Sequence, residues 1–172
     1  VSDYNCAPIT SAAVAGVLSS TLPDINMVSA PTIARDKGIA ITETKKDEHS
    51  AYESYIRINL VSKKEKFSIG GTICSEGHPR IVQINGINLE AGLMPNMLYV
   101  TNKDVPGLIG SLGNILGDEK INIASFNLGR TGPLKDAIAL IGVDKAVNDN
   151  VIKEVEKLDS VVQVKSLNFN II

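Results

Sequence analysis

Tryptophan is missing from this 172-residue chain, aromatic residues make up only 4% of it, and there are two cysteines, Cys6 and Cys74. So few aromatics leave little for stacking nucleic-acid bases. The formal net charge of -2 provides no basic surface for a phosphate backbone. The two distant cysteines do not have the spacing of a metal site, and they favour a reducing, cytoplasmic setting. We therefore expect neither a nucleic-acid partner nor a bound metal.

Long apolar runs are also missing. None approaches the roughly 18 residues that a membrane-spanning helix needs, and no basic-then-apolar signal segment opens the chain. We therefore expect no membrane partner. The sequence begins at Val1 rather than at a methionine and soon enters a helical pattern, which suggests a piece of a longer protein. The hydrophobic fraction of 44% is ordinary for a globular protein with one good core or two small ones.

The first half of the sequence predicts helices followed by a mainly antiparallel sheet, in a domain covering residues 1–93. Helices are expected at 8–20 and 30–39, the second ended by Gly38. Alternating patterns predict the strands, and Asn85-Gly86 predicts a tight hairpin turn. A bulge or close backbone approach is expected at Gly70-Gly71. The strands of this domain are predicted at 24–30, 39–45, 52–62, 67–75, 80–84 and 87–91.

The second half, residues 94–172, predicts the order β-α-β-β-α-β, which is the split βαβ or ferredoxin-like arrangement. The fold class is therefore α+β throughout. Helices are expected at 106–117, ended by Gly117, and at 148–159, capped by Asn148 or Asp149. The far face of this sheet needs cover, and Leu98, Val100, Ala139 and Ile141 are the residues expected on it. Strands are predicted at 96–102, 121–130, 136–144 and 161–169.

The start of the 106–117 helix carries the candidate binding chemistry. Free backbone N–H groups and the helix dipole favour a carboxylate there, and Gly107 leaves the backbone open to close approach. Asp104 could pair with an ammonium group, while Asn102 and Asn122 offer uncharged donors and acceptors. Together these groups suit an amino acid. The alternative is purely structural, with Asp104 capping the helix and Asn122 supporting the turn after it.

Two motifs carry a resemblance to known families. Asp104-Val105-Pro106-Gly107-Leu108 is similar to the D/N-x-P-G-x turn of ACT domains, and "INIASFNLGR" is similar to their second strand. The segments "GGTICSEGHPRIVQING" and "RIVQINGINLEAGLMPNMLYVTNKDVPG" resemble the intervening domain, and its joint to the ACT domain, in the long form of the D-3-phosphoglycerate dehydrogenase family.

This resemblance implies an L-serine site between two ACT domains. The family's serine-contacting positions fall on Asn102, Asp104 and Asn122, and the turn adds Pro106, Gly107 and Leu108. Short members of the family often have histidine where this chain has Asn102. The resemblance also places the anion-binding basic residue of the intervening domain on Arg80. A second basic residue of that site would fall near Gly92, and an ordinary surface charge is the alternative for Arg80.

By the same resemblance, the parent enzyme would oxidise 3-phosphoglycerate with NAD at the first step of serine synthesis. This part would bind L-serine as feedback inhibitor and assemble as a homodimer or homotetramer through its ACT and intervening domains. It shows no dinucleotide fingerprint and no catalytic residues, so no cofactor is expected within it. Two alternatives stay open, namely the regulatory part of an iron–sulfur L-serine dehydratase and an oligomerisation module without a ligand.

Overall fold

The structure is a computed structural model that describes residues 5–45, 52, 54–75, 77–132 and 135–169. The chain forms two compact units, residues 1–55 and 56–172. The first is helical, and the second holds two antiparallel sheets, so the predicted α+β class is confirmed. The predicted domain boundary after residue 93 stays a prediction. No helix in the described part of the chain is long and apolar enough to cross a membrane.

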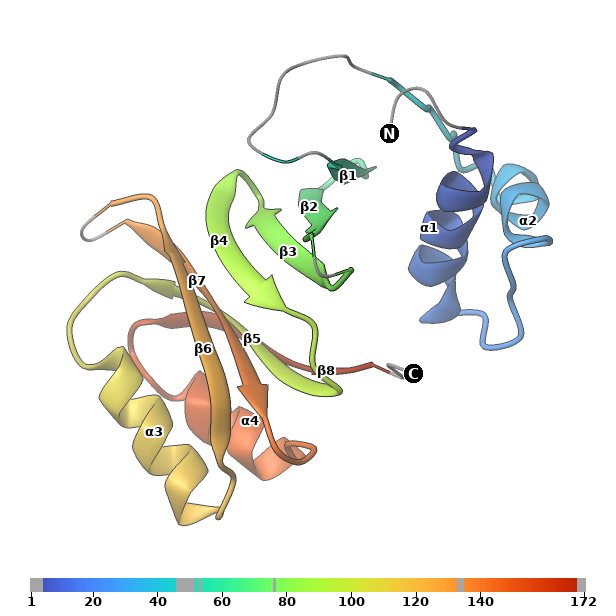
Figure 1. Ribbon diagram of the computed structural model, residues 1–172. Coiled ribbons are helices and arrows are strands. Elements are labelled where there is room, and N and C mark those ends of the chain that lie inside the picture. Colours follow the sequence, from blue (N-terminus) through green and yellow to red (C-terminus); the bar gives the residue numbers. More distant parts are fainter. Residues whose placement is uncertain (1–4, 46–51, 53, 76, 133–134, 170–172) are drawn as a thin grey trace. The chain divides into compact units, whose positions relative to one another are not determined.

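The first unit contains two helices, α1 (Ala7–Ser19) and α2 (Ala30–Asp36), as the sequence predicted (Figure 1). Gly38 ends α2 with a φ of 74°, and its N–H donates to the carbonyl of Arg35 at 2.9 Å. A left-handed residue at this position is what glycine allows at low cost.

The strands predicted at 24–30 and 39–45 are wrong. The Asn26 side chain accepts from the N–H groups of Val28 (2.9 Å) and Ser29 (3.0 Å), which closes a turn that leads directly into α2. Such local bonds compete with strand pairing. Residues 39–45 have no strand assignment, although Ile39 and Ile41 alternate as a strand would.

The first sheet of the second unit is antiparallel in the order β1-β2-β3-β4. Its register shifts between Gly70 and Gly71, which confirms the bulge, and Asn85 and Gly86 take φ angles of 49° and 80° in the hairpin turn. Both angles lie in the left-handed region that a two-residue hairpin of this kind requires. The strands are β1 (Ile56–Val61), β2 (Lys66–Ile73), β3 (Pro79–Ile84) and β4 (Ile87–Gly92).

The second sheet has the order β6-β7-β5-β8, all antiparallel, and both of its helices lie on one face (Figure 1). This is the predicted split βαβ topology. Its elements are β5 (Asn96–Lys103), α3 (Leu108–Asp118), β6 (Ile123–Arg130), β7 (Asp136–Val143), α4 (Asp149–Glu156) and β8 (Val161–Asn168).

Two details of the helix ends differ. Asn148 caps α4, since its side chain accepts from the N–H of Val151 at 3.0 Å. Gly117, in contrast, does not end α3, which continues to Asp118. The left-handed residue is Lys120 instead, with a φ of 55°, so a lysine occupies the position that the sequence assigned to glycine.

The two faces of the second sheet were assigned the wrong way round. Leu98, Val100, Ala139 and Ile141 face the helices and pack with their apolar residues, Leu112 among them. The opposite face packs against β3 and β4 of the first sheet, which supplies the cover that the sequence called for. A strand of continuous apolar residues has no polar face to fix its orientation. The residues of this inter-sheet core are Ile81, Ile84, Ile87, Leu89, Ala91, Met97, Tyr99, Ile138 and Leu140.

Candidate functional site

The site is built where β5 ends and α3 begins. After Lys103 the chain turns, and the N–H of Asp104 donates to the carbonyl of Lys135 at 2.8 Å. Gly107 is the N-cap residue of α3 with a φ of 103°, and no side chain caps the helix. The structural alternative in which Asp104 caps α3 is therefore wrong. The first N–H groups of an uncapped helix have no partner within it, and they remain available to an anion.

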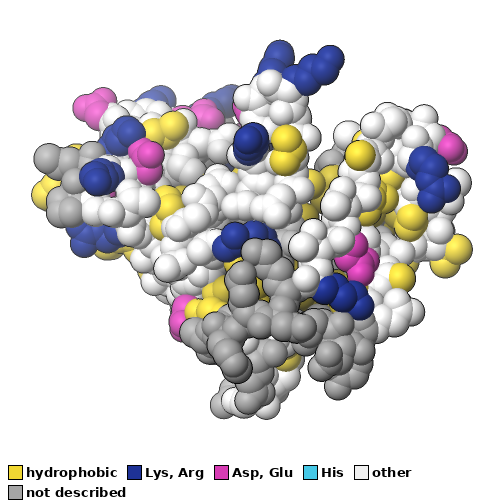
Figure 2. Space-filling view, turned by 90° about the horizontal axis from the view of Figure 1, so that it is seen from above, with side chains coloured by type: hydrophobic (Ala, Val, Ile, Leu, Met, Phe, Trp, Pro, Cys, Tyr) yellow, Lys and Arg dark blue, Asp and Glu magenta, His cyan; other side chains and the backbone are white. Residues whose placement is uncertain are grey.

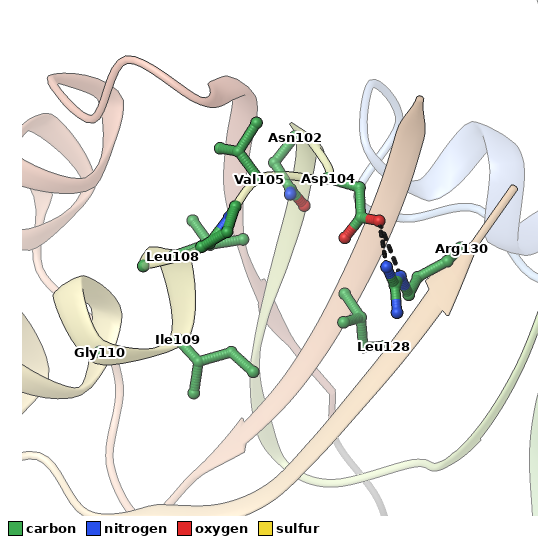
Figure 3. A pocket seen from close by; sticks show the side chains of 10 residues that line it. Asn102, Asp104, Val105, Leu108, Ile109, Gly110, Leu128 and Arg130 are labelled. Atoms are coloured by element: carbon green, nitrogen blue, oxygen red, sulfur yellow. Dashed lines mark hydrogen bonds and ion pairs between the residues drawn. The ribbon is translucent and has the colours of Figure 1, made fainter. Parts of the chain in front are cut away.

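A pocket of about 430 Å³ opens at this helix end (Figure 3). Its walls come from the end of β5, the turn, the first turn of α3 and the end of β6. It combines an apolar lining with one carboxylate, one guanidinium and one amide, which is the usual character of a small-molecule site. The lining residues are Asn102, Asp104, Val105, Pro106, Gly107, Leu108, Ile109, Gly110, Leu128 and Arg130.

The charges of the pocket belong to Asp104 and Arg130. The Arg130 guanidinium donates from Nε (2.8 Å) and from Nη2 (2.5 Å), and both hydrogen bonds end on Oδ2 of Asp104 (Figure 3). The Asp104 side chain is only 12% exposed, whereas that of Arg130 is 52% exposed. Because both hydrogen bonds end on Oδ2, the second carboxylate oxygen, Oδ1, accepts none from the side chains of the described residues and can accept from another donor.

Asn102 provides an uncharged acceptor beside this pair. Its side chain lies on the helix-facing side of β5, since it follows Leu98 and Val100 at two-residue intervals. Only 2% of it is exposed, and Nδ2 donates to the carbonyl of Lys103 at 2.8 Å. The amide oxygen Oδ1 is buried and has no hydrogen-bond partner among the residues that the structure describes. A buried acceptor without a donor costs about 1–3 kcal/mol, so a ligand that donates to it gains affinity.

Asn122 does not join these residues within one chain. It is exposed beyond the opposite end of α3, just before β6. Its N–H donates to Oδ1 of Asp144 at 3.0 Å, and its carbonyl accepts from the N–H of Asp144 at 3.2 Å. A role of Asn122 in the site of a second copy stays a prediction.

Arg80 is also outside the pocket, in the first sheet. It is exposed near the start of β3, and it pairs in register with Thr72 of β2 and Gly92 of β4. Its partner on β4 is therefore a glycine, so this chain has no basic side chain at Gly92. Anion binding at Arg80 stays a prediction.

Sequence reasoning placed Asn102, Asp104, Pro106, Gly107 and Leu108 together, and all five line the pocket. It missed Val105, Ile109 and Gly110 of the turn and helix, and Leu128 and Arg130 of β6. A signal for Arg130 was present, because it follows Phe126 and Leu128 at two-residue intervals and so shares the strand face that meets the helices. The pairing with Asp104 joins residues 26 positions apart, which alternation alone does not reveal.

The described residues hold no cluster of three or more histidine, cysteine, aspartate or glutamate side chains suited to a metal ion. The pocket instead combines a carboxylate, a guanidinium and an amide at a helix start.

Residues 1–85 match the model of the D-3-phosphoglycerate dehydrogenase intervening domain, and residues 96–160 match that of the ACT domain. This chain is an intervening domain of the D-3-phosphoglycerate dehydrogenase family joined to an ACT domain. The candidate pocket lies in the ACT domain, whereas Arg80 lies in the intervening domain.

Curated relatives support the same assignment. The chain is 34% identical over 156 residues to D-3-phosphoglycerate dehydrogenase of Methanocaldococcus jannaschii, covering 89% of this chain and 29% of that enzyme. It is 30% identical over 161 residues to that of Bacillus subtilis, covering 93% and 31%. Identity to chloroplastic D-3-phosphoglycerate dehydrogenase 2 of Arabidopsis thaliana is 29% over 143 residues, covering 76% and 23%. The chain spans about a third of the length of these relatives or less, and it corresponds to their regulatory C-terminal part rather than to a complete dehydrogenase.

Proposed function

We propose that this chain is the L-serine sensor of an NAD-dependent D-3-phosphoglycerate dehydrogenase, with the serine bound at the start of α3 in the ACT domain. The observation that carries the proposal is the pocket itself. It joins an uncapped helix start, a largely buried carboxylate and a buried amide oxygen without a partner. Each of these three groups suits a different polar group of L-serine: its carboxylate, its ammonium or its hydroxyl.

The carboxylate of L-serine would accept from the free N–H groups at the start of α3, where the helix dipole also favours negative charge. Its ammonium would donate to Oδ1 of Asp104, the oxygen that Arg130 leaves open. Its hydroxyl would donate to Oδ1 of Asn102, which has no other partner. Glycine and alanine lack that hydroxyl, so they would leave the buried oxygen unpaired.

A second copy of the chain would complete the site. The pocket is far larger than one serine molecule, and its rim carries exposed apolar side chains, Val105 at 36% and Ile109 at 55% exposure. We propose a homodimer, or a homotetramer of such dimers, in which Asn122 of one copy reaches the serine held by the other. Because the site then needs both copies, serine would tighten the assembly. A coupling of about 1–3 kcal/mol suffices for feedback control.

The parent activity that we propose is oxidation of 3-phosphoglycerate with NAD in the cytoplasm, at the first step of serine synthesis. The activity is supported by relatives covering 76–93% of this chain that are D-3-phosphoglycerate dehydrogenases, whereas the cytoplasmic setting rests on the cysteine content alone. The same relatives favour a dehydrogenase over an iron–sulfur L-serine dehydratase as the parent.

Isothermal titration calorimetry of the purified chain with L-serine tests the proposal. Glycine, L-alanine and 3-phosphoglycerate serve as matched ligands. We expect saturable binding of L-serine, weaker by about ten-fold for L-alanine because it strands the Asn102 oxygen. If none of these ligands produces a saturable signal, the chain is an oligomerisation module without a ligand at this site.

A further inference from the structure

Arg130 adds a positive charge to a pocket that already contains the Asp104 carboxylate. Asp104 lines the pocket, and its Oδ2 accepts both hydrogen bonds from Arg130. Without Arg130, the pocket would hold one negative charge, which favours cations of any kind. With Arg130, the charged side chains of the pocket sum to zero.

We infer that Arg130 is a specificity-determining residue that makes the pocket select neutral zwitterions over simple amines. This inference rests on the proposed binding of L-serine at the same site. The guanidinium binds Oδ2 through two hydrogen bonds and leaves Oδ1 to the ligand. The ligand ammonium therefore binds beside the guanidinium rather than in place of it, and two cations share one carboxylate.

Two cations on one carboxylate repel each other, and that repulsion must be offset by a negative group on the ligand. The ligand carboxylate would provide it, because the α3 start that would bind this carboxylate and Arg130 line the same pocket. A ligand that has an ammonium but no carboxylate is repelled by the Arg130 guanidinium, and no attraction of a carboxylate offsets that repulsion. The Arg130 side chain is half exposed, so water weakens this effect without abolishing it.

The test uses L-serine and L-serinamide, which share the ammonium and hydroxyl and differ in the carboxylate. We expect the parent chain to bind L-serine more tightly than L-serinamide. In Arg130→Gln the ratio of the two affinities should fall by about ten-fold or more, since both the attraction for the carboxylate and the repulsion of the amine are lost. A residue that only supports the fold would change both affinities by the same factor.

Three variants accompany Arg130→Gln. Lys103→Gln removes a neighbouring positive charge that pairs with Asp136 and does not line the pocket. Its ratio of L-serine to L-serinamide affinity should therefore stay at the parent value. Arg130→Lys keeps the charge but cannot make both hydrogen bonds to Oδ2, so its ratio of L-serine to L-serinamide affinity should lie between those of the parent and Arg130→Gln. Asp104→Asn leaves the pocket with a positive charge and should shift the preference toward 3-hydroxypropionate, which is serine without its ammonium.

Each outcome has a definite meaning. If the parent binds L-serine and the folded Arg130→Gln chain keeps the parent ratio, Arg130 does not determine specificity, and the serine site stands. If Arg130→Gln does not fold, the Arg130→Lys and Asp104→Asn ratios decide in its place, and an unchanged preference in Asp104→Asn overturns the inference. If the parent does not bind L-serine, the proposed function and this inference both fail.

Discussion

Replacing Asp104 with alanine separates ligand binding from folding at this site. The substitution removes the carboxylate that we propose as the partner of the ligand ammonium, and it also breaks the ion pair with Arg130. A hydrogen bond to a charged group contributes about 1.5–3 kcal/mol, which corresponds to roughly a ten- to hundred-fold loss of L-serine affinity. Arg130 already balances part of the carboxylate charge, so we expect the result to lie toward the ten-fold end.

The stability cost of the same substitution should be small. Arg130 is 52% exposed, and water can solvate its guanidinium once Asp104 is gone. An ion pair with one exposed partner contributes about 0.2–1 kcal/mol. Calorimetry with L-serine measures the affinity, and urea denaturation followed by circular dichroism measures the free energy of unfolding.

Asp136→Ala is the matched control, because it breaks the exposed Lys103–Asp136 pair outside the pocket. We expect it to leave L-serine affinity at the parent value. If Asp104→Ala stays folded and binds L-serine as the parent does, the serine site lies elsewhere. If it loses several kcal/mol of stability instead, Asp104 is mainly a structural residue.

Four further results are expected. Asn122→Ala should weaken L-serine affinity by about ten-fold and abolish serine-linked dimerisation in analytical ultracentrifugation, whereas an unchanged sedimentation profile would exclude it from the site of a second copy. Arg80→Ala should weaken phosphate binding measured by calorimetry, and equal binding to parent and variant would make Arg80 a surface charge. Gly129→Ala should lower the free energy of unfolding in urea by about 1–3 kcal/mol, because its new Cβ would lie 2.6 Å from the Asn88 carbonyl oxygen. Gly113→Ala has open space around it and should raise the same free energy by about 0.5–1 kcal/mol, so similar values for both variants would refute the close approach of β4 to β6. The purified chain should not reduce NAD with 3-phosphoglycerate, and any absorbance rise at the NADH wavelength above a no-enzyme control would contradict its assignment as a regulatory part.

The second sheet and its helices followed from the sequence because each element has a long and regular pattern. The α3 helix shows apolar residues at helical spacing, and the Asn85-Gly86 turn has the residues that its backbone angles require. The strands predicted at 24–30 and 39–45 failed for a local reason. They are short, and the Asn26 side chain stabilises a turn that a pattern of apolar residues does not reveal.

The orientation of the second sheet could not be read from its strands. β7 is buried along nearly its whole length, so its two faces are equally apolar. Only tertiary contacts decide that Ile141 meets the helices and Leu140 meets the first sheet. For the same reason the sequence predicted that the sheet face opposite the helices packs against another element, but it did not reveal which apolar residues lie on that face.

The candidate site was predictable where its residues are consecutive and hidden where they are not. Asn102 to Leu108 follow one another from the end of β5 through the turn to the start of α3, and the chemistry of a free helix start follows from this segment alone. Arg130 comes from another strand, and its partner is known only once β6 lies beside the start of α3. Likewise, Oδ1 of Asn102 is left without a hydrogen-bond partner only because the folded chain buries it, which the sequence alone does not reveal.

Titration of the isotope-labelled chain with L-serine, followed by the backbone amide shifts, tests serine binding at the start of α3 most directly. We predict saturable shifts concentrated at Gly107, Leu108 and Ile109, with smaller ones at Asn122 as the second copy closes on the site. Amides of α4, which lie outside the pocket, should stay in place. Saturable shifts that leave the 107–109 amides unmoved, or no shifts at all, would contradict the proposed site.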